Sequence, residues 1–274
     1  MESLPLYVNT PTSNSSRCIL MIRTFFLLLI FSFSAFFAIA QDTSSERARQ
    51  IFEEVDNRRD KITYEKALMQ MIIYDSKGRS RNREIQSYAS DKGDTEKTLL
   101  VFKEPASVRG TAFLTLSKGT DEVQKLYLPA LSRIQTITAS QKGDRFMGSD
   151  FTYEDLGNQN PDEYDFELLS EDENTAVLKA VKKEDSQYAY IRFYINTNRY
   201  VLDKAEYFNE DGAMIKRLET ANYTNDFENI WLAGKMTMFD LHEDRKTELR
   251  WSNRTINEAI PEWRFTERGL RRGD

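Results

Sequence analysis

Short stretches of alternating apolar and polar residues dominate the chain from residue 62 onward. Such alternation is typical of β-strands with one buried face. Turn residues separate the stretches, as in Asp75–Gly78 and Asn209–Gly212, where glycine tolerates the positive φ that hairpin turns require. The predicted strands are Ile62–Tyr74, Arg81–Ala89, Thr95–Lys103, Thr111–Leu116, Val123–Leu128, Ser132–Thr138, Glu163–Ser170, Thr175–Lys182, Tyr188–Asn196, Tyr200–Phe208, Ala213–Tyr223, Ile230–Phe239 and Arg245–Asn253.

Two segments have helical patterns instead. Thr43 and Glu46 form a capping box, after which apolar residues recur at i, i+3, i+4 and i+7 on one helix face. That apolar stripe consists of Ala48, Ile51, Phe52 and Val55. In the middle of the chain, Ser149 or Asp150 can cap a short helix that runs through Leu156. Both helices are expected to cover an apolar face of the sheet.

Many short strands with few helices between them exclude a parallel sheet built from βαβ units. The sequence therefore predicts a mainly β protein, with a curved antiparallel sheet or barrel formed by one domain over residues 41–274. No repeat or linker divides this region.

Several predicted strands are apolar on both faces, which has two interpretations. The first is an ordinary core, because any sheet needs apolar alternation. The second is a concave apolar cavity, in which flexible, polarizable methionine side chains would accommodate variable acyl chains. The candidate cavity residues are Met69, Met71, Phe113, Leu126, Leu128, Met236, Met238 and Trp251.

The N-terminal segment Met21–Gln41 resembles an export signal. It has a basic residue, Arg23, then a long apolar run and an Ala38-Ile39-Ala40 cleavage pattern. We expect residues 1–40 to be removed, with Met21 as the true start; the alternative is a membrane anchor. Cys18 precedes the apolar run, so it cannot be the lipid-modified cysteine of a lipoprotein. It is the only cysteine, so the mature chain contains no disulfide.

Charge and motif content exclude several functions. The formal net charge of −6 argues against nucleic-acid binding. His242 is the only histidine and lies in a polar turn, so neither a Ser-His-Asp triad nor a zinc site is indicated. The sequence has no G-x-S-x-G elbow, dinucleotide-binding fingerprint or P-loop. We therefore expect no catalytic activity, no metal and no cofactor.

Four segments resemble a known family. Lys142–Leu156 (KGDRFMGSDFTYEDL) looks like a hallmark of the bacterial outer-membrane lipoprotein-sorting proteins of the LolA-like superfamily. Val101–Leu116, Lys204–Arg217 and Ile256–Leu270 strengthen the likeness, which covers nearly all of residues 41–274. These motifs are turns and junctions, so they are specific for the family and say little about mechanism.

The resemblance implies an incomplete antiparallel β-barrel whose hollow face is covered by helices. Acyl chains of lipoproteins or other lipids would lie in that hollow while a soluble, monomeric carrier crosses the periplasm. An inner-membrane transporter or exporter is the implied partner. The alternatives are a lipid-handling accessory of a resistance-nodulation-division exporter, an adaptor that senses lipoproteins, and an envelope hydrolase that uses His242.

Overall fold

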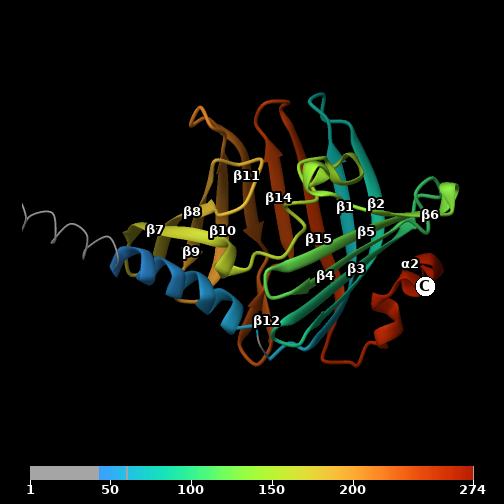
Figure 1. Cartoon of the computed structure of the whole chain (residues 1–274), viewed down its shortest axis with the longest axis horizontal. Coiled ribbons are helices and arrows are strands. Elements are labelled where there is room, and N and C mark those ends of the chain that lie inside the picture. The colour runs from blue at the N-terminus through green and yellow to red at the C-terminus, as the bar shows by residue number, and fades with distance from the viewer. Residues whose placement is uncertain (1–42, 60, 274) are drawn as a thin grey trace, which may run out of the picture. The chain divides into compact units, whose positions relative to one another are not determined.

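The computed structural model describes residues 43–59 and 61–273, and within them thirteen strands pair in one curved antiparallel sheet (Figure 1). The mainly β prediction is confirmed, and the sheet does not close into a barrel. The segment Met21–Gln41 lies outside the described residues. Of the strands in the described residues, β12 and β13 pair only with each other and the others form the thirteen-stranded sheet. The strands are β1 (Tyr64–Tyr74), β2 (Ser80–Asp91), β3 (Thr95–Glu104), β4 (Ala112–Lys118), β5 (Asp121–Leu128), β6 (Arg133–Thr136), β7 (Tyr164–Glu171), β8 (Thr175–Lys182), β9 (Tyr190–Asn196), β10 (Val201–Phe208), β11 (Met214–Ala221), β12 (Thr224–Phe227), β13 (Ile230–Leu232), β14 (Lys235–Asp240) and β15 (Arg245–Ile256).

The strand order explains why one long connection crosses the sheet. The order is β6-β5-β4-β3-β2-β1-β15-β14-β11-β10-β9-β8-β7, so the chain starts in the middle and reaches one edge at β6. It then resumes at the opposite edge with β7 and returns inward until β15 pairs with β1. The connection from β6 to β7 must therefore span the width of the sheet. Residues 139–160 of this connection, here called the cover segment, pass in front of the sheet in Figure 1.

The cover segment is not helical where a helix was expected, so the prediction of a helix from Ser149 or Asp150 through Leu156 is wrong. The backbone N–H of Glu154 donates to the carbonyl of Lys142 at 2.8 Å, which folds the segment back on itself as an irregular hairpin. The backbone bonds that a longer helix would need are therefore made across this hairpin. Short 3-10 turns at Ala139–Gln141 and Phe146–Gly148 complete the segment.

The predicted N-terminal helix is present over residues 43–57. Ala48, Ile51 and Phe52 are buried, and Val55 packs against the same core at its margin. The apolar stripe thus meets the main hydrophobic cluster, which includes residues from both halves of the sheet. Among residues 43–59 and 61–273, no helix is long and apolar enough to cross a membrane.

The C-terminal segment covers part of β3, β4 and β5 and forms a separate hydrophobic cluster with β2, β3 and β4. Its last element is the short helix α2 (Glu267–Arg272), whose Leu270 is fully buried. Gly269 is required here, because a Cβ atom would lie 2.0 Å from the carbonyl oxygen of Arg264. The family-like segment Ile256–Leu270 is therefore a packed structural element.

The predicted strand Ile230–Phe239 is two strands rather than one. It breaks at Gly234, whose N–H donates to the carbonyl of Asn222 at 3.0 Å. A Cβ atom at residue 234 would lie 2.4 Å from that carbonyl oxygen. β13 pairs with β12, whereas β14 joins the large sheet between β11 and β15. The break separates Ile230 from Met236 and Met238, although all three lie within the single strand predicted over Ile230–Phe239.

Candidate functional site

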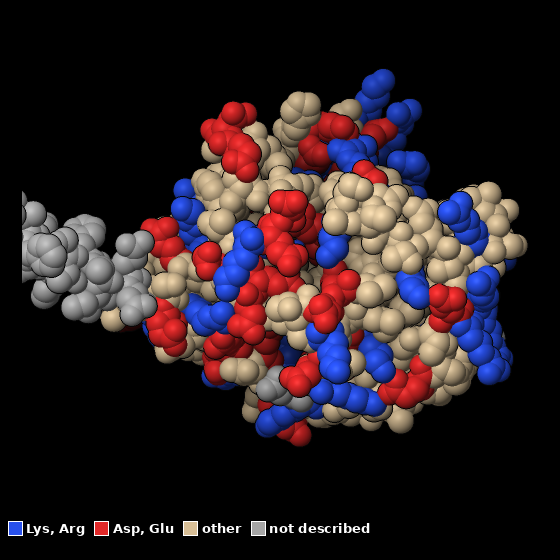
Figure 2. Space-filling model, in the orientation of Figure 1, with Lys and Arg blue, Asp and Glu red and all other residues tan. Residues whose placement is uncertain are grey.

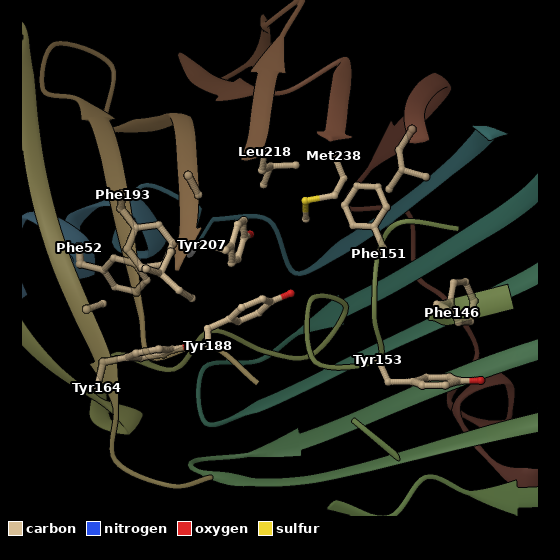
Figure 3. Packing of buried hydrophobic residues seen from close by; sticks show 14 of the residues in the cluster. Phe52, Phe146, Phe151, Tyr153, Tyr164, Tyr188, Phe193, Tyr207, Leu218 and Met238 are labelled. Atoms are coloured by element: carbon tan, nitrogen blue, oxygen red, sulfur yellow. The ribbon is translucent and has the colours of Figure 1, made fainter. Parts of the chain in front are cut away.

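The cover segment fills one half of the inner face of the sheet with aromatic rings. Phe146 is fully buried, with its ring centroid 4.9 Å from that of Phe113 and 5.9 Å from that of Phe102. Tyr153 lies 5.6 Å from Phe113 by the same measure. Figure 3 shows Phe146 and Tyr153 together on this side of the core. Phe102 of β3 and Phe113 of β4 are therefore packed against aromatic rings of the cover segment.

The other half of the inner face is hollow. A cavity of about 320 Å³, here called the large cavity, lies between the cover segment and strands β9, β10, β11, β14 and β15. A volume of this size suits a small ligand or part of one acyl chain. Its lining residues are Phe151, Glu154, Asp155, Leu156, Gly157, Gln159, Tyr164, Tyr188, Ile191, Phe193, Leu202, Tyr207, Leu218, Met236, Met238, Leu249 and Trp251.

Aromatic packing bounds the large cavity on the side of the N-terminal helix. Phe52 of this helix lies 5.1 Å from Phe193 and 6.4 Å from Tyr164, measured between ring centroids. Tyr188 and Tyr207 form a further pair at 4.7 Å. Figure 3 shows these rings grouped around the space that Leu218 and Met238 also border. Such tilted ring pairs contribute about 0.5–1.5 kcal/mol beyond area burial, so this wall is rigid.

A buried polar cluster lies where the cover segment meets the cavity. The ammonium Nζ of Lys216 is 3.2 Å from Asp155 Oδ2, and the hydroxyl of Tyr188 donates to Asp155 Oδ1 at 2.7 Å. Burial is the main cause of a pKa for the Tyr188 phenol well above its ordinary value, so Tyr188 stays protonated as a donor. The backbone N–H of Thr152 also donates to Asp155, at 2.7 Å. This carboxylate therefore fixes the cover segment to β11.

A second polar cluster holds the cover segment to β15. Thr247 donates through its hydroxyl to Asp150 Oδ2 at 2.7 Å, and Arg245 Nε lies 3.2 Å from Asp150 Oδ1. Burial raises the pKa of Asp150, while the Thr247 bond and the two nearby arginines, Arg245 and Arg145, oppose that shift. Arg145 also pairs with Glu243 at 2.9 Å. Figure 2 shows charged side chains of both signs across this face.

The large cavity is lined mainly by apolar and aromatic side chains. Its lining contains no histidine, serine, cysteine or lysine, although two carboxylates, Glu154 and Asp155, are present. The residues that the structure describes contain no group of three His, Cys, Asp or Glu side chains placed to hold a metal ion. His242 is exposed in the turn between β14 and β15, and its backbone N–H donates to Asp240 at 3.0 Å. It is not among the residues that line the cavity.

The eight candidate cavity residues fall into two groups. Met236, Met238 and Trp251 line the large cavity. The other five belong to the same hydrophobic cluster without lining that cavity: Met69, Met71, Phe113 and Leu126 are buried in it and Leu128 packs at its margin. Their role in lipid binding stays a prediction.

Sequence reasoning missed most of the lining. In the last predicted strand, Thr247, Leu249 and Trp251 alternate with Lys246, Glu248 and Arg250, and this signal would have added Leu249 to the candidates. Tyr188, Tyr207 and Leu218 carried no comparable signal, because a buried strand position looks the same whether it contacts a neighbour or a cavity.

The fold is an open antiparallel sheet with an apolar cavity on its inner face and a crossing segment above it. A protein-family model described as "-like: Uncharacterized protein" matches residues 94–272. A crystal structure described as an outer membrane lipoprotein-sorting protein domain from Vibrio parahaemolyticus is 30% identical, with a TM-score of 0.79. The match covers 83% of this chain and 99% of that one. The chain belongs to the family of outer membrane lipoprotein-sorting proteins.

Two further structures share the fold. A DUF1329 family protein from Desulfovibrio piger is 24% identical with a TM-score of 0.77, covering 83% of this chain and 99% of its own. A LolA superfamily protein from Nitrosomonas europaea is 21% identical with a TM-score of 0.63, covering 80% and 97%. At these identities the likeness concerns the fold alone. No curated protein of known function matches the sequence.

Proposed function

We propose that the protein is a periplasmic carrier that binds acyl chains of lipoproteins or other lipids in the large cavity and transfers them across the cell envelope. The observation that supports this most is an apolar hollow of about 320 Å³ on the inner face of the sheet, next to the main hydrophobic cluster. The family supports the same function, because its relative from Vibrio parahaemolyticus is described as a lipoprotein-sorting domain.

Binding would rest on apolar area. Each buried methylene contributes about 0.8 kcal/mol, so about eight methylenes would contribute roughly 6 kcal/mol before the cost of association. Leu218, Met238 and Leu249 supply aliphatic walls from three strands of the sheet, and Phe193 and Trp251 supply aromatic ones. No precise polar match is needed for such a ligand, which suits a carrier of variable acyl chains.

The proposed site of action is the periplasm, where the chain would act as a single domain of residues 41–274 after removal of residues 1–40. An inner-membrane transporter or exporter would be the donor or acceptor of the cargo. Mass spectrometry of the protein, purified from periplasmic extract without detergent, tests both the removal of residues 1–40 and the presence of a lipid cargo. We expect a chain that begins at Gln41 and carries a lipid or a triacylated lipoprotein in near-equal amount.

A cavity-filling variant tests the site itself. Leu218→Trp on β11 places a larger side chain into the large cavity, and we expect at least a tenfold loss of affinity for a fluorescent fatty-acid probe. Met214→Trp on the same strand is the control, because Met214 is 37% exposed and does not line the cavity. Overpacking costs about 1–3 kcal/mol, so the unfolding midpoint of both variants is measured alongside. Equal probe affinity in a folded Leu218→Trp protein would remove the large cavity as the binding site.

A further inference from the structure

A second cavity of about 100 Å³, here called the small cavity, adjoins the large one. Leu202 and Met236 line both, so the two share an apolar wall. The small cavity lies where the end of the N-terminal helix meets the β9–β10 turn and the region around β13. The large cavity and the small cavity are therefore direct neighbours.

Three guanidinium groups line the small cavity, and its lining includes no acidic residue. Arg58 and Arg59 follow the N-terminal helix, whereas Arg199 belongs to the turn between β9 and β10. The three therefore converge from segments about 140 positions apart in the sequence. Such a gathering of like charge favours an anion in the space between them.

The carboxylates near these arginines leave some guanidinium N–H groups available to bind a ligand. Arg58 uses Nε to bond Glu54 at 2.6 Å, and Arg199 lies 3.6 Å from Asp203, beyond hydrogen-bond distance. Arg59 lies 3.6 Å from the carboxylate of Glu65, which accepts a 2.9 Å bond from Arg254. The pairs of Arg58 with Glu54 and of Arg199 with Asp203 are partly exposed, where an ion pair contributes only about 0–1 kcal/mol, whereas the Glu65 side chain is only 13% exposed. An anion in the small cavity would thus find unused guanidinium N–H groups.

Aromatic rings hold two of the guanidinium groups in place. Arg199 Cζ lies 5.1 Å from the ring centroid of Tyr223 and 5.3 Å from that of Trp231. Arg58 Cζ lies 4.8 Å from the ring of Tyr200. Stacking of this kind orients the planar fork that binds phosphate through two parallel bonds.

Tyr200 itself is in a strained conformation. Its φ is +49°, in the left-handed region that a bulky side chain seldom adopts. Such strain costs of order 1–3 kcal/mol and is found mainly at functional sites. In this backbone conformation the Tyr200 ring lies against the guanidinium group of Arg58, and both residues line the small cavity.

We propose that the small cavity binds the phosphate headgroup of an anionic amphiphile whose acyl chain lies in the large cavity. This rests on the carrier function proposed above and narrows its cargo to phosphate-bearing lipids. In this proposal the acyl chain and the headgroup of one ligand meet beside Leu202 and Met236, which line both cavities. Arg58 and Arg199 supply the charge-assisted bonds to the phosphate. The other source of the same chemistry is free inorganic phosphate.

Two probes with the same chain and different headgroups test the proposal. Dodecyl phosphate and dodecanol are titrated against the delipidated full-length mature protein by displacement of a fluorescent fatty-acid probe. We expect dodecyl phosphate to bind at least tenfold more tightly than dodecanol. In the Arg58→Gln/Arg199→Gln variant we expect this preference to disappear while the dodecanol affinity stays within twofold. Arg79→Gln is the control, since Arg79 is an exposed arginine of the β1–β2 turn paired with Asp75.

The outcomes separate the two proposals. Equal binding of both probes to the wild-type protein overturns the headgroup site and leaves the carrier intact. Binding of neither probe overturns the carrier and the headgroup site together. Binding of inorganic phosphate alone, detected by calorimetry and lost in the double variant, overturns the amphiphile in favour of a phosphate site. If the double variant fails to unfold cooperatively, Arg199→Gln alone is used with the same expectation of a reduced preference.

Discussion

The buried contact between Lys216 and Asp155 tests how the cover segment is held on the sheet. The side chain of Lys216 is 9% exposed and that of Asp155 is 1% exposed, with 3.2 Å between their charged atoms. At an effective dielectric constant of roughly 20, this separation corresponds to about 5 kcal/mol of attraction. Lys216→Met removes the cation and leaves the carboxylate buried with only the Tyr188 hydroxyl and a backbone N–H as partners.

Removing one partner of a buried pair costs about 3–5 kcal/mol, mainly because the remaining charge is uncompensated. For a chain of this length, each kcal/mol lowers the melting temperature by about 2–4 °C, so we expect a decrease of roughly 6–20 °C. The double variant Lys216→Met/Asp155→Asn has no such charge, and its amide can still meet the neighbouring donor groups. We therefore expect the double variant to recover most of the lost free energy of unfolding.

Urea unfolding followed by tryptophan fluorescence gives the free energy of unfolding for the wild type, both single variants and the double variant. The coupling energy from this cycle isolates the pair from the rest of the network. Lys179→Met serves as the control, since Lys179 faces Glu167 at 3.5 Å in a largely exposed pair. We expect it to cost less than about 1 kcal/mol. A similarly small cost for Lys216→Met, or a double variant less stable than both singles, would refute the argument.

Two further predictions concern a carboxyl group and a glycine. Burial, with a smaller contribution from the Asp91 carboxylate, raises the pKa of Glu96 from 4.5 to about 7, so the folded state binds a proton more tightly than the unfolded chain. The contribution of Glu96 to the free energy of unfolding is therefore fully present below pH 4.5 and is lost as the pH rises toward 7. Because Glu96 is partly exposed, solvent screening reduces this contribution to about 1–2 kcal/mol. Glu96→Gln should flatten this part of the stability curve between pH 5 and pH 8 in urea titrations, and an unchanged slope would contradict it. Gly234→Ala should lower the free energy of unfolding by more than about 1 kcal/mol, because its Cβ would meet a backbone carbonyl at 2.4 Å. Gly143→Ala, with only ordinary contacts at 3.7 Å or more, should change the free energy of unfolding by less than about 0.5 kcal/mol, and urea titrations measure both variants.

Local sequence signals predicted the elements with little error. Thr175–Lys182 begins and ends where expected, and most other strands differ by one to three residues at their ends. The capping box and apolar stripe of the N-terminal helix were equally direct, because both depend on residues within one or two turns. The exceptions were β12, the break at Gly234, the helix α2 and the central segment through Leu156, which is an irregular hairpin rather than a helix. All of them depend on contacts beyond the local sequence.

The candidate site was predicted less well than the fold. Met236, Met238 and Trp251 line the large cavity, whereas Met69 and Met71 belong to the solid part of the core. Apolar alternation identifies an inward-facing side chain, but it does not reveal whether another side chain stands opposite. Here the cover segment decides, because Phe146 fills one half of the inner face and leaves the other half open.

The sequence by itself determined the strands, the turns between them and the family, since each is encoded in residues close together along the chain. Only the tertiary structure decided that the central segment forms an irregular hairpin rather than a helix, and where it leaves a cavity. It also decided that Arg58 and Arg199 meet beside that cavity. The physical reason is that cavities and charge clusters arise from residues far apart in the sequence, whose distances are set by sheet order and packing rather than by local pattern.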